Sequence, residues 1–202
     1  MKKALILVAL AVPSLAVAMG QTSAWNIDSA HSAAHFTVRH MMVSNVHGAF
    51  SKLTGTLNLD DRDITRSSVE AVIDATTIDT REPQRDTHLR SADFFDVANF
   101  PTIVFKSTQV AKGDGDNLKV TGDLTLHGIT KQVVLDVEPL SPPIKDQRGT
   151  LRSGVTATTK INRKDFGLVW NRVLEAGGVA VSDEVRIQLE LEIVKKAAPA
   201  AN

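Results

Sequence analysis

Apolar and polar residues alternate with a period of two along most of this chain, and this alternation constrains the fold more than any other feature. In the clearest stretch five apolar positions are interleaved with polar ones, and these five are Val185, Ile187, Leu189, Leu191 and Ile193. The pattern predicts a strand with one face buried and the other in water. Similar stretches lie at residues 34–38, 53–59, 69–73, 103–105, 118–126, 133–137 and 155–161. We therefore expect an all-β fold of about eight long strands, with a possible short strand around residues 25–27.

The connections between these stretches are short and carry turn residues. Residues 113–117 read Gly-Asp-Gly-Asp-Asn, whose residue types tolerate positive φ, and residues 127–130 form a second tight reversal. Short hairpins join antiparallel neighbours, and about eight such strands form either a closed barrel or a sandwich. A chain of 202 residues fits one domain, and no repeat or linker divides it.

The strand pattern stops between residues 76 and 101. Pro83 suits the first position of a helix, and we expect a short helix in the connection around residues 83–92. Three of the seven phenylalanines, Phe94, Phe95 and Phe100, follow in a stretch without strand periodicity. Because aromatic side chains are usually buried, this connection is predicted to pack against the end or the flank of the strands.

Both ends of the chain differ from this pattern. A basic start, Met1-Lys2-Lys3, precedes an apolar run that ends in Ala16-Val17-Ala18. These features predict a secretory signal peptide at residues 1–18, and the apolar run is too short to span a bilayer. We expect a soluble protein exported to the periplasm, with a single domain at residues 19–196 and a disordered tail at residues 197–202.

Composition and motifs exclude several classes of function. Lys plus Arg and Asp plus Glu both number 23, and the resulting net charge of zero does not suit a nucleic-acid surface. The chain has no cysteine, which excludes thiol catalysis and thiolate metal sites. It contains neither a Gly-x-Ser-x-Gly nor a His-Glu-x-x-His motif. We therefore expect no catalytic residues and no enzyme activity.

Several motifs resemble those of the YceI-like proteins, an exported family that binds polyisoprenoids. The two longest are Arg-Asp-Thr-His-Leu-Arg-Ser at residues 85–91 and Gly-Asp-Leu-Thr-Leu-His-Gly-Ile-Thr at residues 122–130. Shorter matches follow the family's order between residues 25 and 194: His31-Ser32, Phe36, His40, Phe100-Pro101, Phe105, Arg163 and Asp165-Phe166-Gly167. The resemblance implies an extended eight-stranded antiparallel barrel of lipocalin-like shape, often in a homodimer. It also implies one long amphiphile inside the barrel, such as a polyprenyl chain, an isoprenoid quinone or a fatty acyl derivative, and no other cofactor.

The apolar positions of the strands supply the candidate lining of such a barrel. Nine are expected to face the interior and bind the lipid: Phe36, Val38, Leu57, Ile73, Phe105, Leu124, Leu135, Ala157 and Leu189. Several inward positions are small: Ala34, Gly55, Ala71, Gly122, Val133, Val155 and Ala157. Small inward residues leave room for hydrocarbon, whose burial contributes about 0.8 kcal/mol per methylene. The alternative is a filled barrel without ligand, which would make the chain a stress-related structural or interaction protein.

Polar residues form a second candidate site. They are His31, His40, Arg85, Asp86, His88 and Arg90. They form either a polar lid over a lipid head group or an internal network of Arg–Asp ion pairs. Within residues 85–96 the two arginines and three aspartates, Asp86, Asp93 and Asp96, nearly balance in charge, which favours the network. Four histidines fall within residues 31–47, but their spacings do not place them all on one strand face. We therefore expect no metal site.

A long connection follows Trp170. Residues 171–183 are too many for a hairpin turn and include several aliphatic side chains. Tryptophan is favoured as an anchor in protein interfaces. This segment is expected to form a homodimer contact, to overhang the mouth of the barrel or to fold back on its own barrel.

Overall fold

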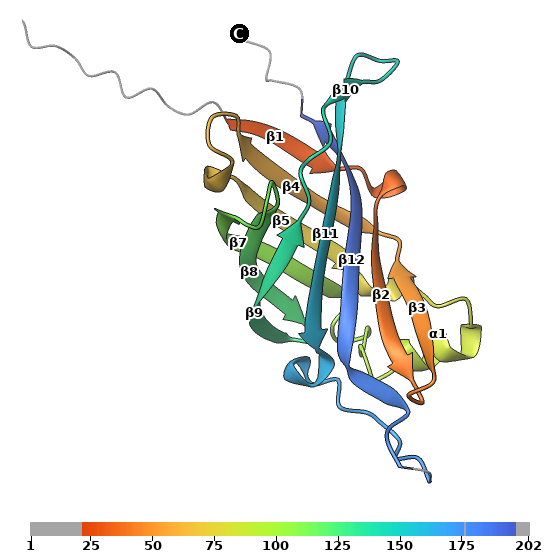
Figure 1. Cartoon of the computed structure of the whole chain (residues 1–202). Coiled ribbons are helices and arrows are strands. Elements are labelled where there is room, and N and C mark those ends of the chain that lie inside the picture. Colours follow the sequence, from red (N-terminus) through yellow and green to blue (C-terminus); the bar gives the residue numbers. More distant parts are fainter. Residues whose placement is uncertain (1–21, 176, 197–202) are drawn as a thin grey trace, which may run out of the picture.

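The computed structural model describes residues 22–175 and 177–196 (Figure 1). The expected signal peptide and C-terminal tail lie outside these residues. The strands are β1 (Thr22–Ile27), β2 (Ala33–His40), β3 (Ser44–Phe50), β4 (Leu53–Asp60), β5 (Ser68–Asp74), β6 (Ile78–Asp79), β7 (Thr102–Lys112), β8 (Leu118–Leu126), β9 (Ile129–Val137), β10 (Ile144–Lys145), β11 (Leu151–Asn162) and β12 (Val181–Lys195). The helical elements are α1 (Pro83–Arg90) and the 3-10 turns η1 (Ser29–His31), η2 (Ile64–Arg66), η3 (Ala75–Thr77) and η4 (Arg163–Phe166). Over this part of the chain no helix is both long and apolar enough to cross a membrane.

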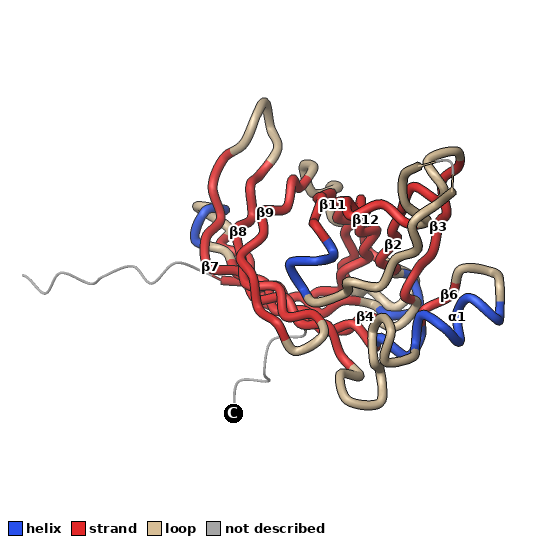
Figure 2. The backbone as a smooth tube through the Cα atoms, turned by 90° about the horizontal axis from the view of Figure 1, so that it is seen from below, coloured by secondary structure: helices blue, strands red, loops and turns tan. Residues whose placement is uncertain are grey.

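Eight of the strands close into an antiparallel barrel. Their order is β11-β9-β8-β7-β5-β4-β1-β12, and β12 pairs back to β11. Figure 1 shows the barrel from the side and Figure 2 shows it from below. β2, β3 and β6 extend the sheet from β12, and β10 adds a short strand to β11. The structure thus confirms the expected all-β, eight-stranded barrel with a short helix in the predicted connection.

The last strand, β12, pairs with strands from both the beginning and the end of the described chain. It pairs with β11 on one side along almost its whole length. On its other side its first part pairs with β2, and its C-terminal end pairs with β1. Ile27 of β1 lies opposite Ile193 of β12, whose side chain is fully buried. The barrel is therefore closed by contact between its first and last strands.

Two glycines in the strands lie under aromatic rings of the neighbouring strand. A Cβ atom added to Gly48 would lie 2.3 Å from Cζ of Phe36, and one added to Gly122 would lie 2.5 Å from Cζ of Phe105. β3 was not predicted from the sequence, because Gly48 stands at an inward position of that strand and interrupts its apolar face. The room for hydrocarbon expected beside the small residue Gly122 is absent, since the ring of Phe105 fills it.

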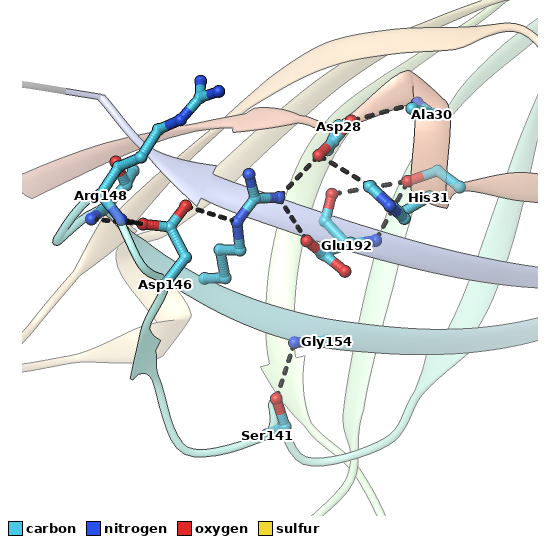
Figure 3. Close-up of polar contacts among 11 residues, drawn as sticks. Asp28, Ala30, His31, Ser141, Asp146, Arg148, Gly154 and Glu192 are labelled. Carbon is cyan, nitrogen blue, oxygen red and sulfur yellow. Dashed lines mark hydrogen bonds and ion pairs between the residues drawn. The ribbon is translucent and has the colours of Figure 1, made fainter.

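A cluster of charged side chains connects four segments at the β10 end of the barrel (Figure 3). The guanidinium of Arg152 on β11 donates to the carboxylates of Asp28 at 2.7 Å, Asp146 at 3.0 Å and Glu192 at 2.5 Å. Nδ1 of His31 also lies 3.0 Å from the carboxylate of Asp28. The Arg152 guanidinium, followed by His31, lowers the pKa of Asp28 to about 2.

Arg152→Met is expected to lower the melting temperature by a few degrees at neutral pH, because three carboxylates lose their shared cation. The pKa of Asp28 lies below its ordinary value of 3.8, so its contribution is present above that pH and is lost as pH falls through about 2. Thermal melts over this pH range should show the difference between parent and variant shrinking. Arg148→Met is the control, because Arg148 has no ion pair within the described residues. A difference that stays constant on acidification would contradict the assignment.

Candidate functional site

The barrel encloses an apolar cavity of about 380 Å³. All eight barrel strands contribute to its wall, together with β2, β3, the helical connection and the loop after η4. The volume lies within the range of about 300–1,000 Å³ typical of small-molecule sites. The alternative of a filled barrel requires side chains to fill the interior, and in this structure they do not.

All nine positions expected to face the interior do line this cavity. β2 contributes Phe36 and Val38. One residue each comes from β4, β5, β7, β8, β9, β11 and β12, in this order: Leu57, Ile73, Phe105, Leu124, Leu135, Ala157 and Leu189. The alternation of inward and outward side chains placed them correctly because it follows from the pleat of each strand. Their role in binding lipid stays a prediction.

Several lining residues come from segments without strand periodicity and were not predicted as lining from the sequence. From the helical connection these are Leu89, Phe94 and Phe95, and from the end of the barrel near η4 they are Leu168, Trp170 and Ala180. The ring of Trp170 lies 5.1 Å from that of Phe94 and 4.9 Å from that of His88. Trp170 therefore packs on its own chain and forms part of the cavity wall.

The six polar candidates do not form one site. His40, Arg85 and His88 line the cavity, whereas Asp86 and Arg90 are not part of its wall. His31 precedes β2 and His40 ends it, so about eight residues of strand, roughly 25 Å, separate them. His31 belongs to the Arg152 cluster instead, and its assignment to the lid was wrong.

The network around α1 holds its connection in place, but not through Arg–Asp ion pairs. Buried Asp86 accepts hydrogen bonds from the backbone N–H and the hydroxyl of Thr80, at 2.9 and 2.6 Å. Arg85 donates to the hydroxyl and the carbonyl of the same threonine, at 2.7 and 2.9 Å. Arg90 donates to the carbonyl oxygens of Thr76 and Ile78. The guanidinium groups are therefore engaged by neutral oxygens.

Asp86→Ala is expected to destabilise the fold by about 2–4 kcal/mol, because it leaves two buried donors of Thr80 without an acceptor. For a chain of this size that corresponds to a fall in melting temperature of roughly 5–15 °C. Asp93→Ala is the control, since Asp93 is exposed and its carboxylate pairs, among the described residues, only with His88 at 2.8 Å. A variant of unchanged stability but weaker lipid affinity would instead support a head-group role for Asp86.

Arg163 is a buried cation at the end of the barrel where Trp170 packs against His88 of α1. Its guanidinium donates to the carbonyl oxygens of Leu168, Trp170 and Ser182, at 2.5, 2.8 and 2.9 Å. One further nitrogen, Nη2, lies 3.6 Å from a carboxylate oxygen of Asp183. Burial lowers the pKa of Arg163, and the Asp183 carboxylate opposes that shift. Arg163 therefore fixes the loop after η4, which carries part of the cavity wall.

The structure does not bring the four histidines of residues 31–47 together. His40 lines the cavity, while His47 is exposed on the neighbouring strand and lies 3.0 Å from the hydroxyl of Thr37. His35 is exposed, although it too is among the residues around the cavity. Asp28, His31 and Glu192 do lie close to one another. The guanidinium of Arg152 already binds two of these three side chains.

The fold and its interior place the protein among the closed antiparallel β-barrels that enclose an apolar cavity. Residues 25–193 match the model of the YceI-like domain, and the chain belongs to this family. A UPF0312 protein of Vibrio cholerae is 37% identical over 198 residues, which cover 97% of this chain and 100% of the relative.

Two solved structures show the same fold. BcnA of Burkholderia cenocepacia superposes with a TM-score of 0.71 at 23% identity, covering 82% of this chain and 98% of BcnA. A protein of Saccharophagus degradans, described as a polyisoprenoid-binding domain implicated in plant cell wall breakdown, superposes with a TM-score of 0.62 at 19% identity. The match covers 86% of this chain and 99% of that domain.

Proposed function

We propose that this protein binds a long-chain amphiphile in its barrel and stores or carries it. The candidates are a polyisoprenoid, an isoprenoid quinone and a fatty acyl derivative. The observation that carries the proposal is the cavity wall, most of whose side chains are aliphatic or aromatic, with a few polar ones such as His40, Arg85 and His88. Such a wall offers few partners for a buried polar group, so hydrocarbon is the chemistry that fits most of it. The polyisoprenoid-binding description of the Saccharophagus domain supports the same class of ligand.

The protein would act by binding and not by catalysis, and it would be exported to the periplasm. The pattern of residues 1–18 supports export through a cleavable signal peptide. A stress-related interaction protein with a filled barrel would have no cavity of this kind. The ligand would be the main partner, with no role for nucleic acid.

Native mass spectrometry of protein purified from its own host tests the proposal. We expect a mass increment that disappears after extraction with organic solvent, and a hydrophobic compound in the extract. The emptied protein should then take up a polyprenyl alcohol from detergent solution. A protein that carries no lipid and takes none up would overturn the proposal.

The homodimer expected from the resemblance stays a prediction. Because the ring of Trp170 packs within its own chain, a contact in this region has to use exposed side chains such as Val173. Light scattering should show a dimer that Trp170→Ala leaves intact, and Val173→Asp tests whether the contact uses this loop or lies elsewhere. A monomeric parent protein would contradict the prediction.

A further inference from the structure

Exposed apolar side chains gather on two neighbouring loops at one end of the barrel. The turn between β2 and β3 carries Met41, Met42 and Val43, which are 45%, 55% and 74% exposed, and the loop before β12 carries Val173, which is 81% exposed. The N–H of Met41 donates to the carbonyl of Ala180 at 2.8 Å, so the two loops are in contact. Figure 1 shows both loops at the lower end of the molecule. We call Met41, Met42, Val43 and Val173 the mouth patch.

The turn itself does not require these side chains. It is closed by a hydrogen bond from Val43 N–H to the carbonyl of His40 at 3.0 Å. Both central residues are left-handed, with φ of 47° at Met41 and 62° at Met42. Asn-Gly adopts such a turn with least strain, whereas an apolar side chain with a positive φ costs free energy. The fold therefore explains neither the choice of methionine nor its exposure.

Residues of the cavity wall flank the mouth patch on both loops. His40 and Val46, on the two sides of the turn, line the cavity, and so do Trp170 and Ala180, on the two sides of the other loop. The exposed tips therefore lie close in sequence to the cavity wall on both loops, with polar residues such as Asn45 and Arg172 between them. A hydrocarbon chain that enters the cavity here would pass beside the exposed tips.

We propose that the mouth patch inserts into the surface of a lipid bilayer, so that the ligand passes between bilayer and cavity without crossing water. This inference rests on the proposed lipid-binding function. A long hydrocarbon chain that crossed water would lose about 0.8 kcal/mol for each exposed methylene, and direct contact between patch and bilayer avoids this barrier. Apolar tips of this kind insert into the boundary between head groups and acyl chains.

The charges around the mouth patch specify the kind of bilayer surface. Those on the same two loops and their flanks are of both signs, and they include Arg39, Lys164, Asp165, Arg172, Glu175, Asp183 and Glu184. Lys164 pairs with Asp183 at 2.9 Å. A mixed set of charges does not select anionic lipids, so insertion of the apolar tips has to provide the affinity.

A double variant, Met41→Asn with Met42→Gly, separates the patch from the fold. These residues suit the turn, so the variant should fold with unchanged or higher stability. In flotation with phosphatidylcholine vesicles, the parent should float and the variant should bind at least about tenfold more weakly, because two apolar side chains are lost. Vesicles that also contain phosphatidylglycerol should bind the parent to a similar extent. A parent that does not float, or a double variant that floats equally well, would overturn the inference.

Two further measurements distinguish this inference from its alternatives. The double variant should take up a polyprenyl alcohol from detergent solution normally but extract it from vesicles slowly, so failure of uptake by the parent would count against the cavity and not against the patch. Light scattering addresses a second copy of the chain as the occupant. A dimer that the double variant dissociates, without flotation of the parent, would assign the mouth patch to self-association and overturn docking on a bilayer.

Discussion

Replacing Ala157 with Trp is expected to abolish uptake of a polyprenyl lipid while the barrel remains folded. Ala157 lies on β11 and lines the cavity with only 3% of its surface exposed. A tryptophan side chain at this position would occupy space that the ligand needs. Excluding three or four methylenes at about 0.8 kcal/mol each lowers affinity by roughly two orders of magnitude. Titration of the emptied protein with a fluorescent polyprenyl analogue measures the loss.

Two companion variants control for misfolding. Ala71 lines the cavity from β5, which lies opposite β11 in the order of the barrel strands, so Ala71→Trp should block the same space from a less buried position. Thr158 is the next residue along β11 and is exposed on the outside, so Thr158→Trp should bind lipid like the parent. Folded variants at Ala157 and Ala71 that both retain full affinity would show that the ligand lies elsewhere.

Arg163→Ala should produce the largest loss of stability among the variants considered, about 3–5 kcal/mol. The substitution leaves the carbonyl oxygens of Leu168, Trp170 and Ser182 without their donor and removes a buried cation from beside Asp183. Chemical denaturation measures the change in unfolding free energy. Because the freed loop contributes Leu168 and Trp170 to the cavity wall, lipid affinity should fall as well.

Lys164→Ala is the matched control for Arg163. The two residues are adjacent and carry the same charge, and both lie near the Asp183 carboxylate. Lys164 is exposed, however, and makes only that one ion pair within the described residues, so its loss should cost less than about 1 kcal/mol. Equal effects of the two substitutions would contradict the structural role assigned to the buried guanidinium.

The strand positions of the cavity were predictable because alternation is a local property of an extended chain. Each strand reveals its inward face through residues such as Leu124 and Leu189, whichever strand it pairs with. Closure into a barrel instead of a sandwich was not predictable from the pattern, because it depends on which strands β12 contacts at each end. β3 was missed because an inward glycine, Gly48, interrupts its apolar face.

For the polar residues, the sequence did not predict the bonding partners. Sequence spacing brought Arg85 and Asp86 together, yet it could not show that both would bind the same threonine, Thr80, instead of each other. Trp170 was singled out as a possible interface anchor, but its contacts with His88 and Phe94 depend on tertiary packing. Residues on loops acquire their neighbours from the complete fold, so a sequence pattern locates them poorly.

The position of β12 has a consequence for the kinetics of folding. β1 pairs with β4 and β2 with β3, but the other edge of each strand pairs with β12, so the barrel cannot close until nearly the whole chain has been synthesised. Until then β11 and the first strands present unpaired edges, which favour pairing with other chains. Closure across such a sequence separation is also entropically costly, so we expect folding in milliseconds to seconds. A chain that ended before β12 would form an open sheet whose two unpaired edge strands could pair with other chains.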